Sequence, residues 1–221
     1  MIVILDTETT GLVEPIEAIE VAWQEIVYGH SFNSKSDLSF LQRFKPSKPI
    51  EFGALATSHI LMSELEECEP SSNFKLPEEV EYIIGHNIDY DWRVIGKPNV
   101  KCICTKAIAT YLIKDIDSYS QSALLYYFLG DPAKPLLKNA HNAKDDVFNC
   151  FTLFIYLIDS IKEDVSTIEL LWEFSEKCRI PTIMPFGKHK GEAIKTIPYD
   201  YKQWLKRQDA VDPYLLKALI V

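Results

Sequence analysis

The chain of 221 residues has no long apolar run, no excess of basic residues and no even set of cysteines. A membrane-spanning helix needs about 18 or more consecutive apolar residues, and no stretch approaches that length. Residues 1–5 are apolar, but they lack the basic start and the longer apolar stretch of a secretory signal peptide. We therefore expect a cytoplasmic protein that does not interact with membranes.

The five cysteines are scattered and odd in number, unlike the disulfide framework of a small secreted protein. Two of them, Cys102 and Cys104, form a C-x-C pair inside an apolar stretch. No second cluster of cysteine and histidine completes a zinc site. We interpret these thiols as buried structural groups, with a metal or redox role as the alternative.

The net charge of −9 argues against a nucleic-acid binder that relies on a broad basic surface. It does not exclude an enzyme that meets phosphate groups through metal ions. The charge is also unevenly distributed, because residues 180–221 contain seven Lys/Arg against four Asp/Glu. The sequence therefore predicts an acidic main domain followed by a small basic one.

The hydrophobic pattern predicts an α/β protein in which helices flank a mixed sheet. Short apolar or alternating runs indicate strands, and apolar residues at helical spacing indicate helices. Three strands come first and helices then alternate with strands, which is the element order of such a sheet. The predicted strands are 2–6, 18–27, 38–44, 80–85 and 100–104, and the predicted helices are 51–60, 62–67, 89–96, 106–113, 121–130, 143–161, 167–178 and 200–208.

Local details add three expectations. Residues 18–27 alternate between apolar and polar side chains, which predicts a strand buried on one face. Residues 133–140 are predicted to form a loop. Ser166 and Glu169 have the spacing of a capping box at the start of a helix.

A change of character near the end of the chain predicts its domain organisation. We place the main domain at residues 1–165, a helical connector at 166–179 and a small domain at 180–221. In the small domain, two strand-like stretches flank residues 186–191, which predicts a hairpin followed by a helix.

The predicted hairpin carries Lys188, His189 and Lys190, which are candidates for contact with DNA phosphates through counterion release. A solvated hairpin that packs on the domain is the alternative. Trp204 and Leu205 are expected in the small domain's own core. Aromatic side chains that could instead stack on bases are Phe186, Tyr199, Tyr201 and Trp204.

The first apolar run ends in two carboxylates, Asp6 and Glu8, within the stretch MIVILDTETTGL. Residues i and i+2 of a strand point to the same side, so both can line the carboxyl end of the sheet, where ligands bind in open α/β folds. Like charges so close repel each other, and burial increases the repulsion. The pattern indicates a site for a positively charged ligand, with a solvated acidic turn as the alternative.

Two further acidic pairs follow later elements in the same way. Asp89 and Asp91 come after the fourth predicted strand, and Asp145 and Asp146 open the longest predicted helix. Hard divalent cations such as Mg²⁺ and Mn²⁺ prefer oxygen ligands. Two such ions roughly 3.5–4 Å apart can act on the attacking and leaving oxygens of a phosphodiester.

With their neighbours, these pairs form three motifs that resemble the DnaQ-like 3′→5′ exonucleases, in the subgroup with four carboxylates and a histidine. The motifs are DTETTG at residues 6–11, HNIDYD at 86–91 and HNAKDD at 141–146, in the family's order. The resemblance implies an RNase H-like fold and a hydrolase that removes nucleoside 5′-monophosphates from a 3′ end. The tail is similar to the small C-terminal domain of one bacterial exodeoxyribonuclease subgroup.

The resemblance implies two Mg²⁺ or Mn²⁺ ions held by Asp6, Glu8, Asp91 and Asp146, with His141 as the general base. Helix geometry agrees for the third motif, because Asp146 lies at the border of the apolar stripe and the preceding aspartate lies nearly opposite it. The other aspartate of the second motif is expected to cap its helix. His141 has a side chain of near-neutral pKa, which suits it to take a proton from water.

The resemblance also implies substrate contacts around the carboxylates. The threonines and the glycine of the first motif supply small donors and a flexible turn. Leu12 is expected to wedge against the terminal base, and a core leucine is the alternative. In the family's nucleotide-binding stretch, isoleucine here replaces the usual glycine after the histidine. The predicted substrate-binding residues are Thr7, Thr9, Thr10, Gly11, Leu12, His59, Ile60, Asn87 and Tyr90.

Together these observations predict a metal-dependent 3′→5′ exodeoxyribonuclease that acts on single-stranded DNA or on duplex 3′ ends, with DNA repair as the expected role. The same chemistry on RNA stays open, because no residue identified here reads a 2′-hydroxyl. A non-catalytic binding or adaptor module and a polymerase proofreading subunit are further alternatives. The oligomeric state also stays open.

Overall fold

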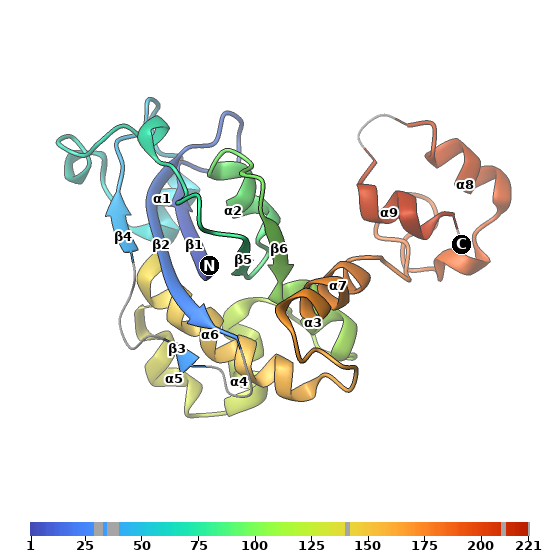
Figure 1. Ribbon diagram of the computed structural model, residues 1–221. Coiled ribbons are helices and arrows are strands. Elements are labelled where there is room, and N and C mark those ends of the chain that lie inside the picture. The colour runs from blue at the N-terminus through green and yellow to red at the C-terminus, as the bar shows by residue number, and fades with distance from the viewer. Residues whose placement is uncertain (29–32, 35–39, 140–141, 209–210, 221) are drawn as a thin grey trace.

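The computed structural model describes residues 1–28, 33–34, 40–139, 142–208 and 211–220 (Figure 1). Within them, helices flank a mixed sheet of six strands, which confirms the α/β fold predicted from the hydrophobic pattern. A smaller helical unit follows at the C-terminal end. Among the helices in the described ranges, none has the length and apolar character needed to cross a membrane.

The sheet is organised around its first strand. The strands are β1 (Ile2–Thr9), β2 (Ala18–Val27), β3 (Asn33–Ser34), β4 (Phe40–Arg43), β5 (Tyr82–Gly85) and β6 (Lys101–Cys104). On one side β1 pairs antiparallel with β2, which also pairs with β3 and β4. On the other side β1 pairs parallel with β5, and β5 pairs parallel with β6. The end of β1 that follows Leu5 therefore lies in the middle of the sheet.

The larger core lies between one face of the sheet and a layer of helices. The helices are α1 (Phe52–Ser58), α2 (Asp89–Val94), α3 (Thr105–Leu112), α4 (Gln121–Leu129), α5 (Ala133–Leu136), α6 (Ala143–Ser160), α7 (Ile168–Cys178), α8 (Tyr199–Leu205) and α9 (Pro213–Ala218). Ile4 and Ile84 of the sheet pack in one cluster with Leu153 and Phe154 of α6. All four side chains are fully buried, so α6 is held firmly against β1.

The opposite face of the sheet is covered by α2 and by aromatic side chains. Val3 and Leu5 of β1 belong to this second cluster. Trp23 stacks on Phe40 with ring centroids 3.8 Å apart, and Phe74 lies edge-on to Trp23. Because β1 is covered on both faces, its sequence is apolar at every position from residue 2 to residue 5.

Strand β2 differs from the predicted strand with one buried face, because its residues are buried on both faces up to Gln24. Its polar residues Glu20 and Gln24 are buried together with the apolar ones. The cause is α6, which packs on β2 although it is distant in sequence. Alternation within the strand carries no information about this helix, so the prediction was wrong on this point.

Several local predictions also need correction. The predicted loop at 133–140 contains α5 and a 3₁₀ turn, and the predicted helix at 62–67 is reduced to a 3₁₀ turn at Met62–Glu64. Helix α7 is capped by Thr167, whose Oγ1 accepts from the N–H of Leu170 at 3.2 Å, rather than by the predicted box one residue earlier. Helix α9 is absent from the prediction, although Asp212 and Pro213 form a recognisable helix start.

The cysteines form no disulfide among the described residues. All five are free thiols, and Cys104, Cys150 and Cys178 are buried. Burial raises the pKa of Cys102 to about 12, which disfavours the reactive thiolate. These environments fit structural thiols, as the sequence indicates.

The small C-terminal unit has a core of its own. The predicted hairpin is reduced to one antiparallel bridge between Ile183 and Ala193. Leu205 is buried as predicted, but Trp204 is 51% exposed, so its predicted place in the core is wrong. The buried core residues are Met184, Ile194, Ile197, Leu205, Leu215, Ala218 and Leu219. Helix α7, by contrast, contributes Leu171 and Phe174 to the main core. The boundaries at 165 and 179 stay a prediction.

A buried arginine joins the small unit to the main domain. Arg179 directly follows α7, and its side chain is only 4% exposed. It pairs with Asp89 of α2 and with Glu176 of α7, and it lies over the ring of Tyr214 from α9 at 5.3 Å. The hydroxyl of Tyr214 donates to Oε1 of Glu176 at 2.8 Å. Asp89 makes no side-chain cap on α2, so its predicted capping role is wrong.

Replacing Arg179 with methionine is expected to loosen the small unit from the main domain. The change leaves the carboxylates of Asp89 and Glu176 without their shared cation. Because both acids are partly exposed and can be hydrated, we expect a loss of about 2 kcal/mol in the free energy of unfolding. Urea unfolding measures this loss, and thermolysin cleavage after α7 should become faster.

The neighbouring variant Lys177→Met is the matched control. It removes an exposed pair with Glu163, whose partners are 54% and 45% exposed, and should cost less than about 1 kcal/mol. Equal stability and equal cleavage rates in the two variants would contradict the role given to Arg179.

Candidate active site

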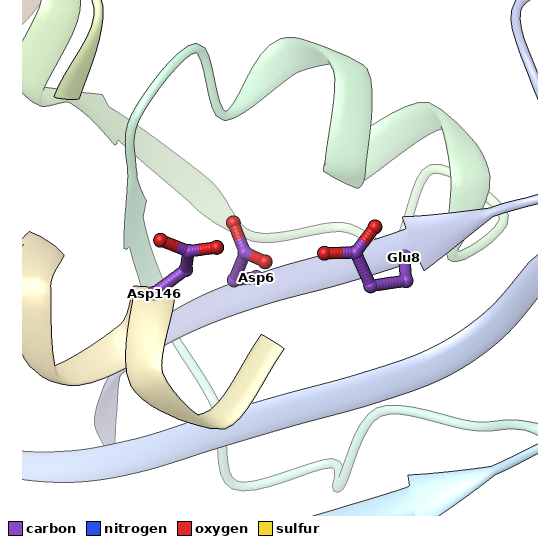
Figure 2. A group of neighbouring side chains, drawn as sticks. All are labelled: Asp6, Glu8 and Asp146. Carbon is purple, nitrogen blue, oxygen red and sulfur yellow. The ribbon is translucent and has the colours of Figure 1, made fainter. Parts of the chain in front are cut away.

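Three carboxylates meet at the carboxyl end of β1 (Figure 2). Asp6 and Glu8 lie on β1, and Asp146 lies in the first turn of α6. Each contributes one oxygen to a group whose members all lie within 4.8 Å of one another. Figure 2 shows the three side chains directed into the same space. In the part of the chain that the structure describes, this is the one group of His, Cys, Asp or Glu compact enough to hold a metal ion.

Strand alternation brings two of these acids to the same face. Asp6 and Glu8 share the face of β1 that carries Ile4, which is the face covered by α6. The strand continues to Thr9, so extended geometry persists through both acids. The sequence-based expectation that the pair lines one side of the strand therefore agrees with the structure.

The start of α6 places the third acid. Asn142 caps the helix, and its Oδ1 accepts from the N–H groups of Lys144 and Asp145 at 3.1 and 3.4 Å. Asp146 then falls in the first turn, where the partial positive charge of the helix end favours a carboxylate. Gln121 of α4 donates to Oδ1 of Asp146 at 3.1 Å and so helps to orient it.

Asp91, the fourth predicted ligand, approaches from the other side of the sheet. It lies in the first turn of α2 and is buried. Its Oδ1 accepts from the hydroxyl of Thr7 at 2.7 Å and from the N–H of Thr7 at 3.1 Å. Asp91 lies outside the compact trio, but among the neighbouring acids its charge contributes most to the raised pKa of Asp6.

Burial and mutual repulsion disfavour the charged forms of these acids. Burial is the largest cause and raises the pKa of Asp6 well above its usual range, with Asp91, Asp146 and Glu8 adding to the effect. Burial, followed by repulsion from Asp146, raises the pKa of Glu8 to about 8. Burial raises the pKa of Asp91 to about 7, although hydrogen bonds from Thr7 oppose the change. The site therefore requires a positive partner to be fully ionised at neutral pH.

A further acid, Glu20, escapes the sequence-based prediction. It lies directly opposite Glu8 in the register of β1 and β2 and is buried. Its Oε2 accepts from Nε of Arg43 at 2.9 Å, whereas its Oε1 is buried without a hydrogen-bond partner among the described residues. The charge of Glu20 raises the pKa of both Asp6 and Glu8. Only the register of the two strands could have revealed it.

A cavity of about 470 Å³ opens beside the carboxylates. This volume lies within the range of small-ligand sites. Glu8 belongs both to the trio and to the cavity wall, so the two features are continuous. Of the predicted substrate-binding residues, the wall contains Thr7, Thr9, Gly11, Leu12, Asn87 and Tyr90, and it adds Glu51, Gly53, Ala54 and Thr57.

The loop after β1 is held in place by Glu51. Its carboxylate accepts from the N–H groups of Leu12 and Val13 at 3.2 and 3.1 Å. Gly11 has φ +143°, and a Cβ atom there would lie 2.1 Å from Cδ of Glu51. A glycine is therefore required at this position. The arrangement leaves the side chain of Leu12 79% exposed at the edge of the cavity.

Two threonines of the first motif have different environments. Thr9 lines the cavity, and its Oγ1 lies 2.6 Å from the hydroxyl of Tyr90. Tyr90 also donates to the carbonyl of Gly11 at 2.8 Å. Thr10 is fully buried, and its Oγ1 accepts from the N–H of Glu17 at 3.1 Å. Thr10 therefore holds the loop and does not line the cavity.

The predicted residues after α1 lie away from the cavity wall. His59 is exposed and ends α1 with a left-handed backbone. Ile60 is buried and packs with Ile19 and Leu65. The isoleucine side chain is therefore part of the core under α1.

Of the histidines in the second and third motifs, His86 lies within the described residues and His141 does not. His86 is partly buried, with ring nitrogens 3.0 Å from Oγ1 of Thr105 and 2.8 Å from the carbonyl of Tyr119. Burial lowers the pKa of His86 to about 4, so it is a neutral structural group at pH 7. His141, the predicted general base, lies outside the described residues, which resume at Asn142.

Sequence comparison links the whole chain to a bacterial nuclease. The chain is 27% identical to exodeoxyribonuclease 10 of Escherichia coli (strain K12) over 225 residues, which cover 99% of this chain and 97% of that protein. Residues 178–214 match a family described as "Putative quorum-sensing-regulated virulence factor". This match falls mainly in the small C-terminal unit.

Structural comparison gives the same fold. Exonuclease X, solved in complex with 5′ overhanging duplex DNA, has a TM-score of 0.57 and 21% identity, covering 77% of this chain and 99% of that one. Cell-death related nuclease 4 has a TM-score of 0.54 and 14% identity, covering 99% of this chain and 96% of that one. These structural likenesses show the fold, and the full-length similarity to exodeoxyribonuclease 10 agrees with the resemblance of the three ordered motifs to the DnaQ-like exonucleases.

Proposed function

We propose that this protein is a divalent-metal-dependent 3′→5′ exodeoxyribonuclease that releases nucleoside 5′-monophosphates. The observation that carries the proposal is the position of Glu8, which is shared by the carboxylate trio and by a cavity of nucleotide size. A nucleotide in that cavity would have its phosphate beside the acids. The similarity to exodeoxyribonuclease 10 along the whole chain supports the same chemistry and favours DNA.

The residues at the site fit two Mg²⁺ or Mn²⁺ ions. All the candidate donors are carboxylate oxygens, which these hard cations prefer, and burial leaves their charges in need of compensation. We assign the ligands to Asp6, Glu8 and Asp146, with Asp91 completing the set from α2. Bound there, the two cations would stabilise the charge that develops on a phosphodiester during hydrolysis.

The cavity would hold the 3′-terminal nucleotide. Leu12 offers an exposed apolar side chain against the base, and Tyr90 fixes the opposite wall through its bond to Gly11. Asn87 contributes a polar group at the same wall. Held in this way, the nucleotide would present its phosphodiester at Glu8.

His141 is the proposed general base. It would accept a proton from the water that attacks phosphorus, while the O3′ of the preceding nucleotide leaves. The products are a nucleoside 5′-monophosphate and a strand shortened by one nucleotide. This role rests on the position of His141 in the third motif, five residues before Asp146.

Three alternatives remain distinguishable. RNA is the first, because the cavity wall offers no described group specific for hydrogen over a 2′-hydroxyl. A non-catalytic binding module is the second, and the complete set of acids argues against it. A proofreading subunit is the third, and the basic small unit favours an independent enzyme.

We further propose a role in DNA repair and a cytoplasmic location, where free thiols such as those found here persist.

A digest of labelled oligonucleotides tests the proposed activity. With Mg²⁺, a 5′-labelled single-stranded DNA should be shortened progressively from its 3′ end, and EDTA should stop the reaction. Asp146→Asn should lower the rate by roughly 10³-fold or more, since it removes a charge that holds the cations. His141→Ala should lower it by about 10²–10⁴-fold while leaving the carboxylates in place.

Asp145→Asn is the matched control for Asp146→Asn, because it makes the same change in the same helical turn outside the trio. It should retain the wild-type rate within about threefold. If an RNA oligomer is degraded faster than the DNA oligomer, RNA replaces DNA as the proposed substrate. If both aspartate variants lose the same fraction of the wild-type rate, Asp146 is not a metal ligand.

Glu8→Gln is expected to stabilise the protein in the presence of EDTA as the pH rises. The folded-state pKa of Glu8 is about 8, above the value of about 4.3 for an exposed glutamate. The folded chain therefore binds this proton more tightly than the unfolded chain, and the resulting stability is lost between about pH 4.5 and pH 8. Glutamine does not titrate, so the variant should gain about 3.5 kcal/mol over wild type from pH 5 to pH 8.

Urea unfolding at the two pH values measures this difference, with the exposed-site variant Glu67→Gln as control. If Glu8→Gln and Glu67→Gln show the same pH dependence, the strong repulsion assigned to Glu8 is absent.

A further inference from the structure

The small C-terminal unit keeps Phe186, Tyr199 and Trp204 exposed at its surface. Its core is aliphatic, and Trp204 is 51% exposed although its neighbour Leu205 is buried. Tryptophan offers more apolar area than any other side chain, so a small domain normally gains from burying it. An exposed tryptophan on a unit with so little core indicates a contact with something outside the unit.

The rings near Trp204 form a continuous row. Tyr201 lies one helical turn before Trp204 on α8, with ring centroids 5.3 Å apart. On its other side, Tyr201 is edge-on to His189 at 4.6 Å. Gly187 has φ +73°, and a Cβ atom there would lie 2.7 Å from the hydroxyl oxygen of Tyr201. The turn at 187–190 therefore packs closely against α8 and presents its side chains beside the row.

The charges around this row are mainly positive. Lys188 and Lys190 are exposed on either side of His189, and Arg207 is exposed one turn after Trp204. Of the nearby acids, Glu192 is engaged by Nδ1 of His189 at 3.0 Å. Asp200 lies in the first turn of α8, where the helix end favours a negative charge. Although the chain has a net charge of −9, these exposed basic side chains can attract phosphate groups locally.

We propose that Trp204, supported by Tyr201 and His189 and flanked by Lys188 and Lys190, is a stacking surface for single-stranded nucleic acid outside the catalytic cavity. A base would stack on the exposed face of Trp204, and the adjoining phosphates would lie beside the two lysines. Stacking on an aromatic face tolerates any base, and basic side chains follow the backbone. The combination of both features favours a nucleic-acid strand over a protein partner.

The surface is separate from the cavity at β1. Figure 1 shows α8 on the side of the small unit that is turned away from the sheet. A strand that reaches both places must span more than the single nucleotide held beside Glu8. The inference rests on the proposed function in taking nucleic acid as the ligand, and it predicts that the small unit matters for long strands and not for very short ones.

Binding of a 5′-fluorescein oligothymidylate to the full-length protein in EDTA tests the proposal without cleavage. Fluorescence anisotropy should show affinity about tenfold weaker for Trp204→Ala than for wild type. Trp204→Phe, which keeps an aromatic face, should recover most of this loss. Replacing Lys188 and Lys190 by glutamine should reduce the slope of log K against log salt concentration by about 0.7 per lysine.

Tyr199→Ala is the matched control. Tyr199 is 72% exposed on the same helix, but five residues from Trp204 it points about 140° away. Its replacement should leave the affinity unchanged. Circular dichroism of each variant checks that the helical content is retained, which the exposure of both side chains favours.

Degradation rates with Mg²⁺ separate this inference from the proposed function. Trp204→Ala should raise KM for a long oligonucleotide about tenfold at unchanged kcat, and should leave the hydrolysis of a trinucleotide as in wild type. Unchanged binding in Trp204→Ala, or an equal loss in Tyr199→Ala, overturns the stacking surface. Weaker binding by Trp204→Ala in a protein without any nuclease activity would support the surface and reject the proposed function.

Discussion

The properties of the site follow from the repulsion among carboxylates that the fold holds close together at the end of β1. Asp6 and Glu8 are carried by the central strand, and Asp146 is carried by a helix whose apolar side is packed against that strand. Neither element can move away without opening the main core, so the acids cannot relax their repulsion by separating. Asp6 and Glu8 relieve it by holding protons, as their raised pKa values indicate. Divalent cations would also relieve the repulsion. With cations bound, the carboxylates can stay ionised and the site can interact with phosphate groups.

Residues around the three carboxylates increase the repulsion among negative charges. Glu20 adds a buried charge directly opposite Glu8, and Arg43 satisfies only one of its two oxygens. Hydrogen bonds within the chain hold the wall of the adjoining cavity. The carboxylate of Glu51 accepts from the N–H of Leu12 in the loop after β1, and the hydroxyl of Tyr90 donates to the carbonyl of Gly11. The cavity is therefore defined before any ligand arrives, and a ligand need not order it. The small unit is tied to the same region through Arg179, whose partner Asp89 lies two residues before the ligand candidate on α2.

Local sequence was informative where a side chain's environment is determined by its own element. The alternation of β1 placed Asp6 and Glu8 on one face, and the apolar stripe of α6 separated Asp146 from its neighbour. Local sequence was insufficient where packing against a distant element determines whether a side chain is buried. Glu20 has the pattern of a solvent-facing strand residue, but α6 covers it. Trp204 has the chemistry of a core residue, yet the small unit closes its core with aliphatic side chains. Such differences arise from tertiary packing, which a window of sequence does not contain.

Calorimetric titration of divalent cations tests the central claim most directly. Mn²⁺ or Mg²⁺ is added to the protein at pH 7 in two buffers of different ionisation enthalpy, and the difference in heat gives the number of protons released. Because Glu8 titrates near pH 8 and Asp6 is also raised, the account predicts the release of about one proton or more on binding. In Glu8→Gln, fewer protons should be released. Tight binding with no proton release, or no binding at all, would contradict it.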